Sequence, residues 1–235
     1  MGKTIIVTGA SSGIGAAVSR LFLEGGWNVA MLARRVDQLA LVADNHPNAQ
    51  VIACDVTDET QVVSAFDAIH DRFGGIDVLF NNAGIFTPQA RIDEIALDDW
   101  QRSLDVNLTG MFLSARQAFR HMVANGGRII NNGSISAQTP RAGSAPYTAT
   151  KHAITGLTKT IALDGRDLNI CCGQIDIGNA HTEMVENLIR SGSTATTMAV
   201  SDAADAVWNM AQLPLSTNVL SMTIMANQMP FVGRG

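Results

Sequence analysis

Short apolar runs alternate with longer segments of helical periodicity along most of this chain. An uninterrupted apolar run is typical of a strand that is buried on both faces of a sheet. Seven such strands are predicted, at residues 4–8, 28–33, 51–54, 76–80, 128–132, 168–175 and 219–226. Between them, apolar residues recur every three or four positions, which predicts helices. The clearest helical segments are residues 14–24, 58–73, 98–124, 146–163 and 201–212.

Strands that alternate with helices build a parallel sheet that is covered by helices on both faces. The pattern therefore predicts an α/β fold, a Rossmann-like doubly wound sheet of seven parallel strands. The chain has 235 residues, which is enough for one full hydrophobic core, and it contains no linker, internal repeat or low-complexity segment. We therefore expect a single domain that spans residues 1–235.

Charge and composition exclude several classes of partner. The formal net charge is −5 and no run of Lys or Arg occurs, so nucleic acid is not an expected partner. The chain lacks an apolar run of membrane-span length and a signal-peptide pattern, which predicts a cytoplasmic protein with no membrane partner. The three cysteines have no metal-ligand spacing, so they are expected to be core thiols and no metal site is predicted.

The first strand is followed by the glycine pattern Gly9-x-x-x-Gly13-x-Gly15 and then by a helix. A strand, a glycine turn and a helix N-terminus are the context that a phosphate-binding loop needs. The glycines permit a tight turn and a close approach of the backbone to a pyrophosphate. The alternative is a glycine-rich turn without a ligand.

Tyr147 and Lys151 lie one helical turn apart, directly after Pro146, which suits the first turn of a helix. A cation beside a phenol favours the phenolate, so Lys151 is predicted to lower the pKa of Tyr147 from its usual value of about 10. Such a tyrosine can donate and accept protons near neutral pH. Taken alone, however, most Tyr-x-x-x-Lys pairs are solvated helix faces.

Six motifs occur together in one order and spacing: Thr8–Gly15 (TGASSGIG), Asp55-Val56, Asn81–Gly84 (NNAG), Asn107, Ser134 and Tyr147-x-x-x-Lys151. In these residues the chain resembles the short-chain dehydrogenase/reductase family, over residues 4 to about 184. The resemblance implies hydride transfer between a nicotinamide cofactor and the carbonyl or alcohol group of a small substrate. It also implies that these enzymes assemble as homodimers or homotetramers.

The resemblance also implies roles for individual residues. Tyr147 would exchange the proton on the substrate oxygen, Lys151 would assist it and hold the nicotinamide ribose, Ser134 would bind the substrate oxygen, and Asn107 would position a water behind Lys151. The implied cofactor contacts are Gly9, Ser11, Ser12, Gly13, Ile14 and Gly15 at the pyrophosphate, Asp55 and Val56 at the adenine, Asn82, Ala83 and Gly84 on the adenosine side, and Tyr147, Lys151, Ile177 and Thr182 on the nicotinamide side. Ile177 departs from the family pattern, which has proline before Gly178.

The residues after the second strand favour NADP(H) over NAD(H). An NAD-selective site of this type has an acidic residue there to accept from the ribose 2′-hydroxyl, but this chain has Ala33. Arg34 and Arg35 follow directly and can contact a 2′-phosphate. Asp37 lies a helical turn too far along the chain. The alternative is that both arginines point into water and that the enzyme is an NAD(H)-dependent alcohol dehydrogenase.

Three further questions stay open. A small-residue stripe of Ala149, Ala153, Gly156 and Thr160 can join two subunits or pack on its own sheet. A non-catalytic dinucleotide-sensing regulator is a competing function, although such a protein has no need of Tyr147 and Lys151. An epimerase or dehydratase is disfavoured because 235 residues leave no room for a longer substrate domain. The substrate is not identified, and the candidate pocket residues are Phe86, Gln138, Asn179 and His181.

Overall fold

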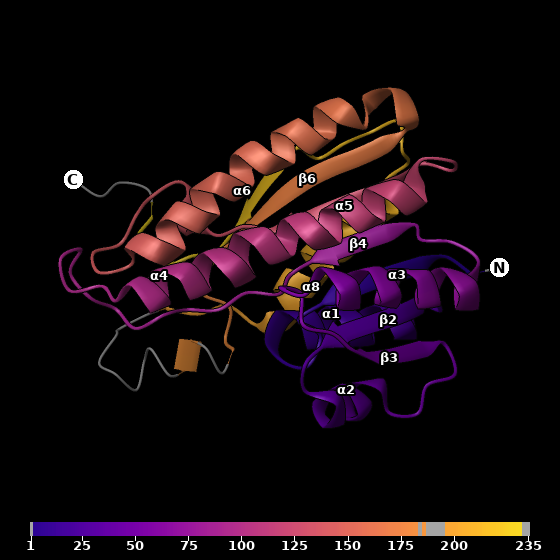
Figure 1. The fold of residues 1–235 in the computed structure, drawn as a ribbon, viewed down its shortest axis with the longest axis horizontal. Helices are drawn as coiled ribbons and strands as arrows, with labels where there is room; N and C mark the ends of the chain where they lie inside the picture. Colours follow the sequence, from indigo (N-terminus) through magenta and orange to yellow (C-terminus); the bar gives the residue numbers. More distant parts are fainter. Residues whose placement is uncertain (1, 183–184, 187–195, 232–235) are drawn as a thin grey trace.

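The computed structural model describes residues 2–182, 185–186 and 196–231. Its centre is a sheet of seven strands in the order β3-β2-β1-β4-β5-β6-β7, and every pairing is parallel (Figure 1). The strands are β1 (Thr4–Thr8), β2 (Asn28–Ala33), β3 (Ala49–Ala53), β4 (Val78–Asn81), β5 (Gly127–Asn132), β6 (Ile170–Ile177) and β7 (Ser221–Ile224). The strand order reverses between β1 and β4, which is where sheets of this type bind ligands.

Helices cover both faces of the sheet. They are α1 (Gly13–Glu24), α2 (Val36–Ala43), α3 (Glu59–Phe73), α4 (Leu97–Leu104), α5 (Gly110–Met122), α6 (Ala145–Asp164) and α8 (Val200–Gln212), with a π-helical segment η1 (Asp105–Thr109) and the 3-10 segments η2 (Ile135–Ala137) and η3 (Arg166–Leu168). Helices α1, α2 and α8 contribute to one core layer, and α3, α5 and α6 contribute to the other. This arrangement confirms the predicted doubly wound fold.

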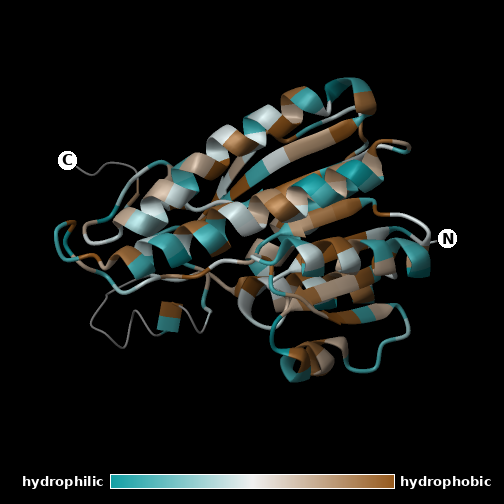
Figure 2. Ribbon diagram, in the orientation of Figure 1, coloured by the Kyte–Doolittle hydropathy of each residue, from teal (hydrophilic) through white to brown (hydrophobic). Residues whose placement is uncertain are grey.

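The apolar runs form strands because their side chains alternate between two buried layers. In β1, Ile5 and Val7 enter the layer with α1 and α8, whereas Ile6 enters the layer with α3 and α5. All five β1 residues are buried. Figure 2 shows largely hydrophobic strands between helices on which hydrophilic and hydrophobic positions alternate.

Two predicted elements differ from the structure in ways that bear on the site, and the bounds of the other predicted strands shift by at most two residues. The long helix expected over residues 98–124 consists of α4, η1 and α5, because η1 is wound as a π-helix. The sixth strand runs on to Ile177, which pairs with Ile224 of β7. Isoleucine has the backbone N–H that proline lacks and a β-branched side chain that favours strands. The residue that departs from the family pattern is thus part of β6.

Neither a membrane span nor a metal cluster is found in the part of the chain that the structure describes. None of its helices combines the length and the hydrophobicity that a bilayer crossing requires. No three His, Cys, Asp or Glu side chains in the same part lie close enough together to hold a metal ion.

Candidate active site

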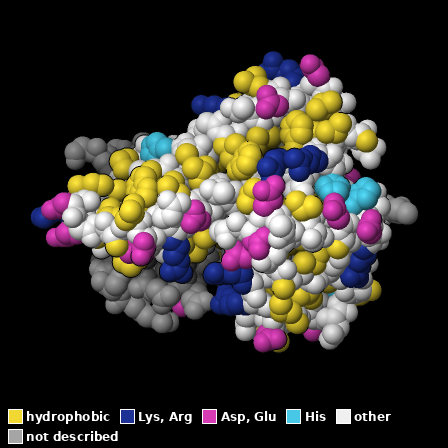
Figure 3. Space-filling model, in the orientation of Figure 1, with side chains coloured by type: hydrophobic (Ala, Val, Ile, Leu, Met, Phe, Trp, Pro, Cys, Tyr) yellow, Lys and Arg dark blue, Asp and Glu magenta, His cyan; other side chains and the backbone are white. Residues whose placement is uncertain are grey.

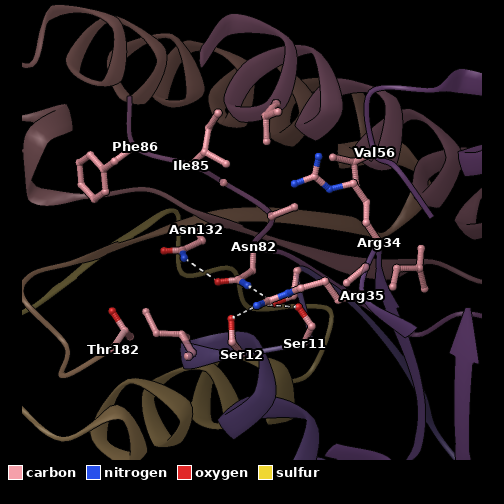
Figure 4. Close-up of a pocket in the computed structure, with 18 of the residues that line it drawn as sticks. Ser11, Ser12, Arg34, Arg35, Val56, Asn82, Ile85, Phe86, Asn132 and Thr182 are labelled. Atoms are coloured by element: carbon pink, nitrogen blue, oxygen red, sulfur yellow. Dashed lines mark hydrogen bonds between the residues drawn. The ribbon is translucent and has the colours of Figure 1, made fainter. Parts of the chain in front are cut away.

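A cavity of about 640 Å³ opens at the carboxyl edge of the sheet, where β1, β2, β4 and β5 end (Figure 4). Most of the predicted site residues line it. They are Gly9, Ser11, Ser12, Gly13, Ile14, Arg34, Arg35, Asp55, Val56, Asn82, Ala83, Gly84, Tyr147, Lys151 and Thr182. Four predicted residues do not line this cavity: Gly15, Asn107, Ser134 and Ile177. Seven further lining residues were not predicted as cofactor contacts: Leu32, Ala33, Cys54, Ile85, Phe86, Val106 and Asn132.

The glycine loop needs its glycines for two different reasons. Gly9 and Gly13 have φ angles of 68° and 55°, a backbone conformation that favours glycine. Gly15 is needed for space, because a Cβ atom there would overlap the carbonyl oxygen of Gly9 and lie 2.7 Å from Nδ2 of Asn82. Ser12, the N-cap residue of α1, makes no side-chain capping bond. The N–H groups at the start of α1 can therefore bind an anion in the cavity.

Two exposed arginines stand at the end of the cavity beside β2. Arg35 donates from Nη2 to the hydroxyl oxygens of Ser11 (3.2 Å) and Ser12 (2.9 Å), across the mouth of the glycine loop. Arg34 lies on the other side, near Val56 (Figure 4). Neither arginine forms an ion pair within the described residues. This end of the cavity is therefore positively charged.

Lys151 and Tyr147 of α6 both line the cavity. Lys151 is only 3% exposed, and its Nζ donates to the carbonyl oxygen of Asn132 at 2.7 Å. Burial lowers the pKa of Lys151 to about 8, although the nearby charge of Asp176 opposes this change. The Nζ atom lies 5.5 Å from the centre of the Tyr147 ring.

The predicted fall in the pKa of Tyr147 is wrong for this structure. Burial of the phenol raises its pKa, and this effect outweighs a hydrogen bond with Ser134 and the charge of Arg141, which both lower it. The charge of Asp176 raises it further. The spacing of Tyr147 and Lys151 indicates a nearby cation, but it does not show how much water the fold removes from the phenol.

Phe86 packs directly on Tyr147. The two rings are stacked, with centroids 3.9 Å apart and planes 27° apart. Phe86 follows the loop after β4 and lines the cavity. It therefore forms an apolar wall against the face of the phenol, as expected for a pocket residue.

Asn107 lies in η1 and is fully buried. Its Oδ1 accepts from the N–H of Ile85 at 2.7 Å, and its Nδ2 donates to the carbonyl oxygen of Ile85 at 2.9 Å and to Oγ of Ser103 at 3.3 Å. The side chain thus binds both backbone groups of a residue in the cavity wall. It positions that wall without lining the cavity itself.

Asn132, at the end of β5, is the main residue that sequence reasoning missed. Its Nδ2 donates to Oδ1 of Asn82 at 2.8 Å, and its carbonyl oxygen accepts from Lys151. Its own Oδ1 is buried and has no hydrogen-bond partner in the structure. The sequence signal that could have identified Asn132 is its position at the carboxyl end of a predicted strand, on the same edge of the sheet as Asn81 and Asn82.

Comparisons with known proteins agree with this site. A family model described as short chain dehydrogenase matches residues 3–192. The chain belongs to the short-chain dehydrogenase/reductase family. It is similar to serine 3-dehydrogenase of Agrobacterium fabrum, with 30% identity over 244 residues that cover 99% of this chain and 97% of that protein. It is also similar to momilactone A synthase of Oryza sativa subsp. japonica, with 42% identity over 167 residues that cover 69% of this chain and 61% of the rice protein.

Solved structures of the same family have this fold. A closed form of serine dehydrogenase complexed with NADP+ matches with a TM-score of 0.92 and 25% identity, covering 99% of this chain and 98% of that one. A 3-ketoacyl-(acyl-carrier-protein) reductase from Brucella melitensis complexed with NADH matches with a TM-score of 0.89 and 25% identity, covering 96% and 98%. This short-chain dehydrogenase is therefore an NAD(P)-dependent oxidoreductase with a Rossmann-like fold.

The residues of the cavity fit a nicotinamide dinucleotide. The glycine loop leaves no room for Cβ atoms at Gly9 and Gly15, so the backbone itself forms the cradle. The start of α1 offers N–H donors to phosphate, and the unpaired Oδ1 of Asn132 offers an acceptor deeper in the cavity.

Proposed function

We propose that this short-chain dehydrogenase transfers a hydride between NADP(H) and the carbonyl or alcohol group of a small substrate, with Tyr147 as the proton donor and acceptor. One domain, residues 1–235, is proposed to hold both cofactor and substrate. The observation that carries the proposal is the meeting of Tyr147, Lys151 and Ser134 beside a cavity whose other end is a phosphate-binding loop. When bound, the nicotinamide supplies or accepts the hydride.

The side chains of this chain then handle the charge on the substrate oxygen. Ser134 and Tyr147 donate hydrogen bonds to that oxygen, which becomes negative as hydride adds to a carbonyl. Lys151 places its positive charge one helical turn away and stabilises the phenolate that remains after Tyr147 gives up its proton. Asn107 supports the site through the backbone of Ile85, and its positioning of a water stays a prediction. The raised pKa of Tyr147 favours the protonated phenol, which is the form that donates a proton when a carbonyl is reduced.

The test is an activity screen with a matched pair of variants. The purified protein is assayed with ketones, aldehydes and alcohols, serine among them, by following the absorbance of the reduced nicotinamide. On a substrate that is turned over, Tyr147→Phe should lower kcat by roughly a hundredfold to ten-thousandfold while the cofactor Kd stays the same. Ser216→Ala, which removes an exposed hydroxyl at the opposite edge of the sheet, should change neither. Near-normal kcat in Tyr147→Phe would exclude the proposed role.

The choice of NADP(H) rests on the arginine end of the cavity. No carboxylate stands at the end of β2, where Ala33 is the last strand residue. The nearest acidic side chain of the wall, Asp55, already accepts from the N–H and the hydroxyl of Thr57 at 3.0 and 2.8 Å. Calorimetric titration of the two oxidised cofactors should therefore give a lower Kd for NADP+. An equal or lower Kd for NAD+ would contradict this preference.

We also propose that the enzyme forms a homodimer or homotetramer through α5 and α6. The exposure of Ala153, Gly156 and Thr160 supports this assembly over packing of the small-residue stripe on its own sheet, and the fourth residue, Ala149, is half-buried. Phe112 on α5 is 43% exposed. Figure 3 shows hydrophobic side chains gathered over the face that α4, α5 and α6 form. Light scattering at micromolar concentration should give the mass of at least two subunits, and a monomer would refute this assembly.

A further inference from the structure

The carboxylate of Asp176 is buried directly beneath the catalytic serine. Asp176 precedes Ile177 on β6 and is 2% exposed. Its Oδ1 accepts from the backbone N–H of Ser134 at 3.0 Å and from Nε2 of Gln174 at 2.6 Å. Its Oδ2 accepts from Nε2 of Gln138 at 2.7 Å. All three partners are donors, which is the arrangement that an ionised carboxylate requires.

The neighbouring strand leaves room for this carboxylate. Gly133 stands between β5 and Ser134, and its N–H donates to the carbonyl oxygen of Ile175 at 2.8 Å. A Cβ atom on Gly133 would overlap Oδ1 of Asp176 and lie 2.7 Å from Nε2 of Gln174. The φ angle of Gly133 is not positive, so a side chain is excluded there by space alone.

The charge of Asp176 has no ion-pair partner within the described residues. A buried charge without such a partner is costly to the fold. Its field reaches the proton-transfer groups, because it raises the pKa of both Lys151 and Tyr147. The charged and titratable groups at this point are thus Tyr147 and Lys151 from α6, Arg141 from the loop before α6, and Asp176 from β6.

We propose that Asp176 is a positioning residue for the reaction proposed above: its carboxylate fixes the backbone of Ser134 beside Tyr147 and supplies the negative charge that balances Lys151 in the buried site. The inference rests on the proposed function, but its main test does not need a substrate. Tyr147 is the one tyrosine of the chain, so the ultraviolet absorbance of tyrosinate reports its titration alone.

The decisive comparison is between Asp176→Asn and Asp176→Glu. Removing the negative charge makes the phenolate easier to form, so Asp176→Asn should move the tyrosinate midpoint down by about one pH unit. Asp176→Glu keeps the charge and should leave the midpoint close to that of the parent protein. Asp164→Asn, at the exposed end of α6, is the control and should not move it. On a substrate, Asp176→Asn should lower kcat at least tenfold with little change in the cofactor Kd.

An unchanged tyrosinate midpoint in folded Asp176→Asn would overturn the proposal. If that variant does not fold, Gly133→Ala replaces it, because its methyl group displaces the carboxylate without removing it. Failure of both variants to fold would assign Asp176 to folding and also overturn the proposal. Failure of the proposed function would look different: the parent protein would turn over no substrate, while the midpoint would still shift in Asp176→Asn.

Discussion

Replacement of Lys151 by methionine should make the ligand-free protein more stable while it removes the cation that is proposed to assist Tyr147. Lys151 is 3% exposed and has no ion pair within the described residues. A methionine has a similar length and carries no charge, so it can fill the same space. The protein therefore gives up stability to keep a cation in this position, as active sites often do.

The size of the effect follows from the pKa of Lys151. A fall from 10.5 to about 8 means that burial of the charged form costs about 3 kcal/mol. The variant avoids this cost, but it also loses the hydrogen bond to Asn132, which destabilises it by about 1 kcal/mol. At pH 7 the variant should therefore be more stable by about 2 kcal/mol, which raises Tm by roughly 4–8 °C for a chain of this length.

The difference in stability between Lys151→Met and the parent protein should depend on pH. Below pH 8 lysine is protonated in both the folded and the unfolded protein, and the full cost of burial is present. Between about pH 8 and 10.5 the folded protein loses the proton first, so the stability of the parent protein rises with pH. The advantage of Lys151→Met should shrink over this window and turn into a deficit of about 1 kcal/mol above it, where only the lost hydrogen bond to Asn132 remains.

Urea unfolding at several pH values, at one protein concentration and without cofactor, measures this difference. Lys159→Met is the matched control, because Lys159 is exposed on the same helix and should give no such gain. The reasoning is refuted if Lys151→Met is no more stable than the parent protein at pH 7, or if its advantage does not change between pH 7 and 10.

Three other variants test separate parts of the structure. Gly15→Ala places a methyl group against the carbonyl oxygen of Gly9, so the cofactor Kd should rise about tenfold by calorimetry, and an unchanged Kd would show that the loop is not the cradle. Arg34→Asp should shift the ratio of the two cofactor Kd values toward NAD+ by roughly 10-fold to 100-fold, whereas Arg20→Asp, on the exposed side of α1, should leave it unchanged. A Cβ atom on Gly156 would have no atom within 4 Å, and arginine favours the helix more than glycine does, so Gly156→Arg should split the oligomer seen by light scattering without lowering Tm; an unchanged mass would place the interface elsewhere.

The fold was predictable because its signals are local. A strand buried on both faces must be apolar along its length, so runs such as Ile5–Val7 indicate both the strand and its depth. The glycine loop and the Tyr147–Lys151 pair are local patterns as well, since each depends on residues within one turn of the chain. Gly9, Gly13, Tyr147 and Lys151 line the cavity, whereas Gly15 lies behind it.

The parts that could not be predicted depend on contacts between distant residues. Asp176 meets Ser134 across 42 residues, and Asn132 meets Asn82 across 50. No periodicity or spacing reports such pairs. The same holds for the pKa of Tyr147, which depends on how completely the assembled fold removes water from the phenol.

The π-helical segment η1 has a consequence for how this protein can change in evolution. Each residue of an α-helix advances the chain by about 100° around the axis, so the wider turn in η1 sets the rotation of α5 relative to α4. Deleting one residue from this segment would rotate α5 by that angle, bring its exposed side toward the sheet and release Ile85 from Asn107. The number of residues between α4 and α5 is therefore fixed, because an insertion or deletion there would turn the whole of α5.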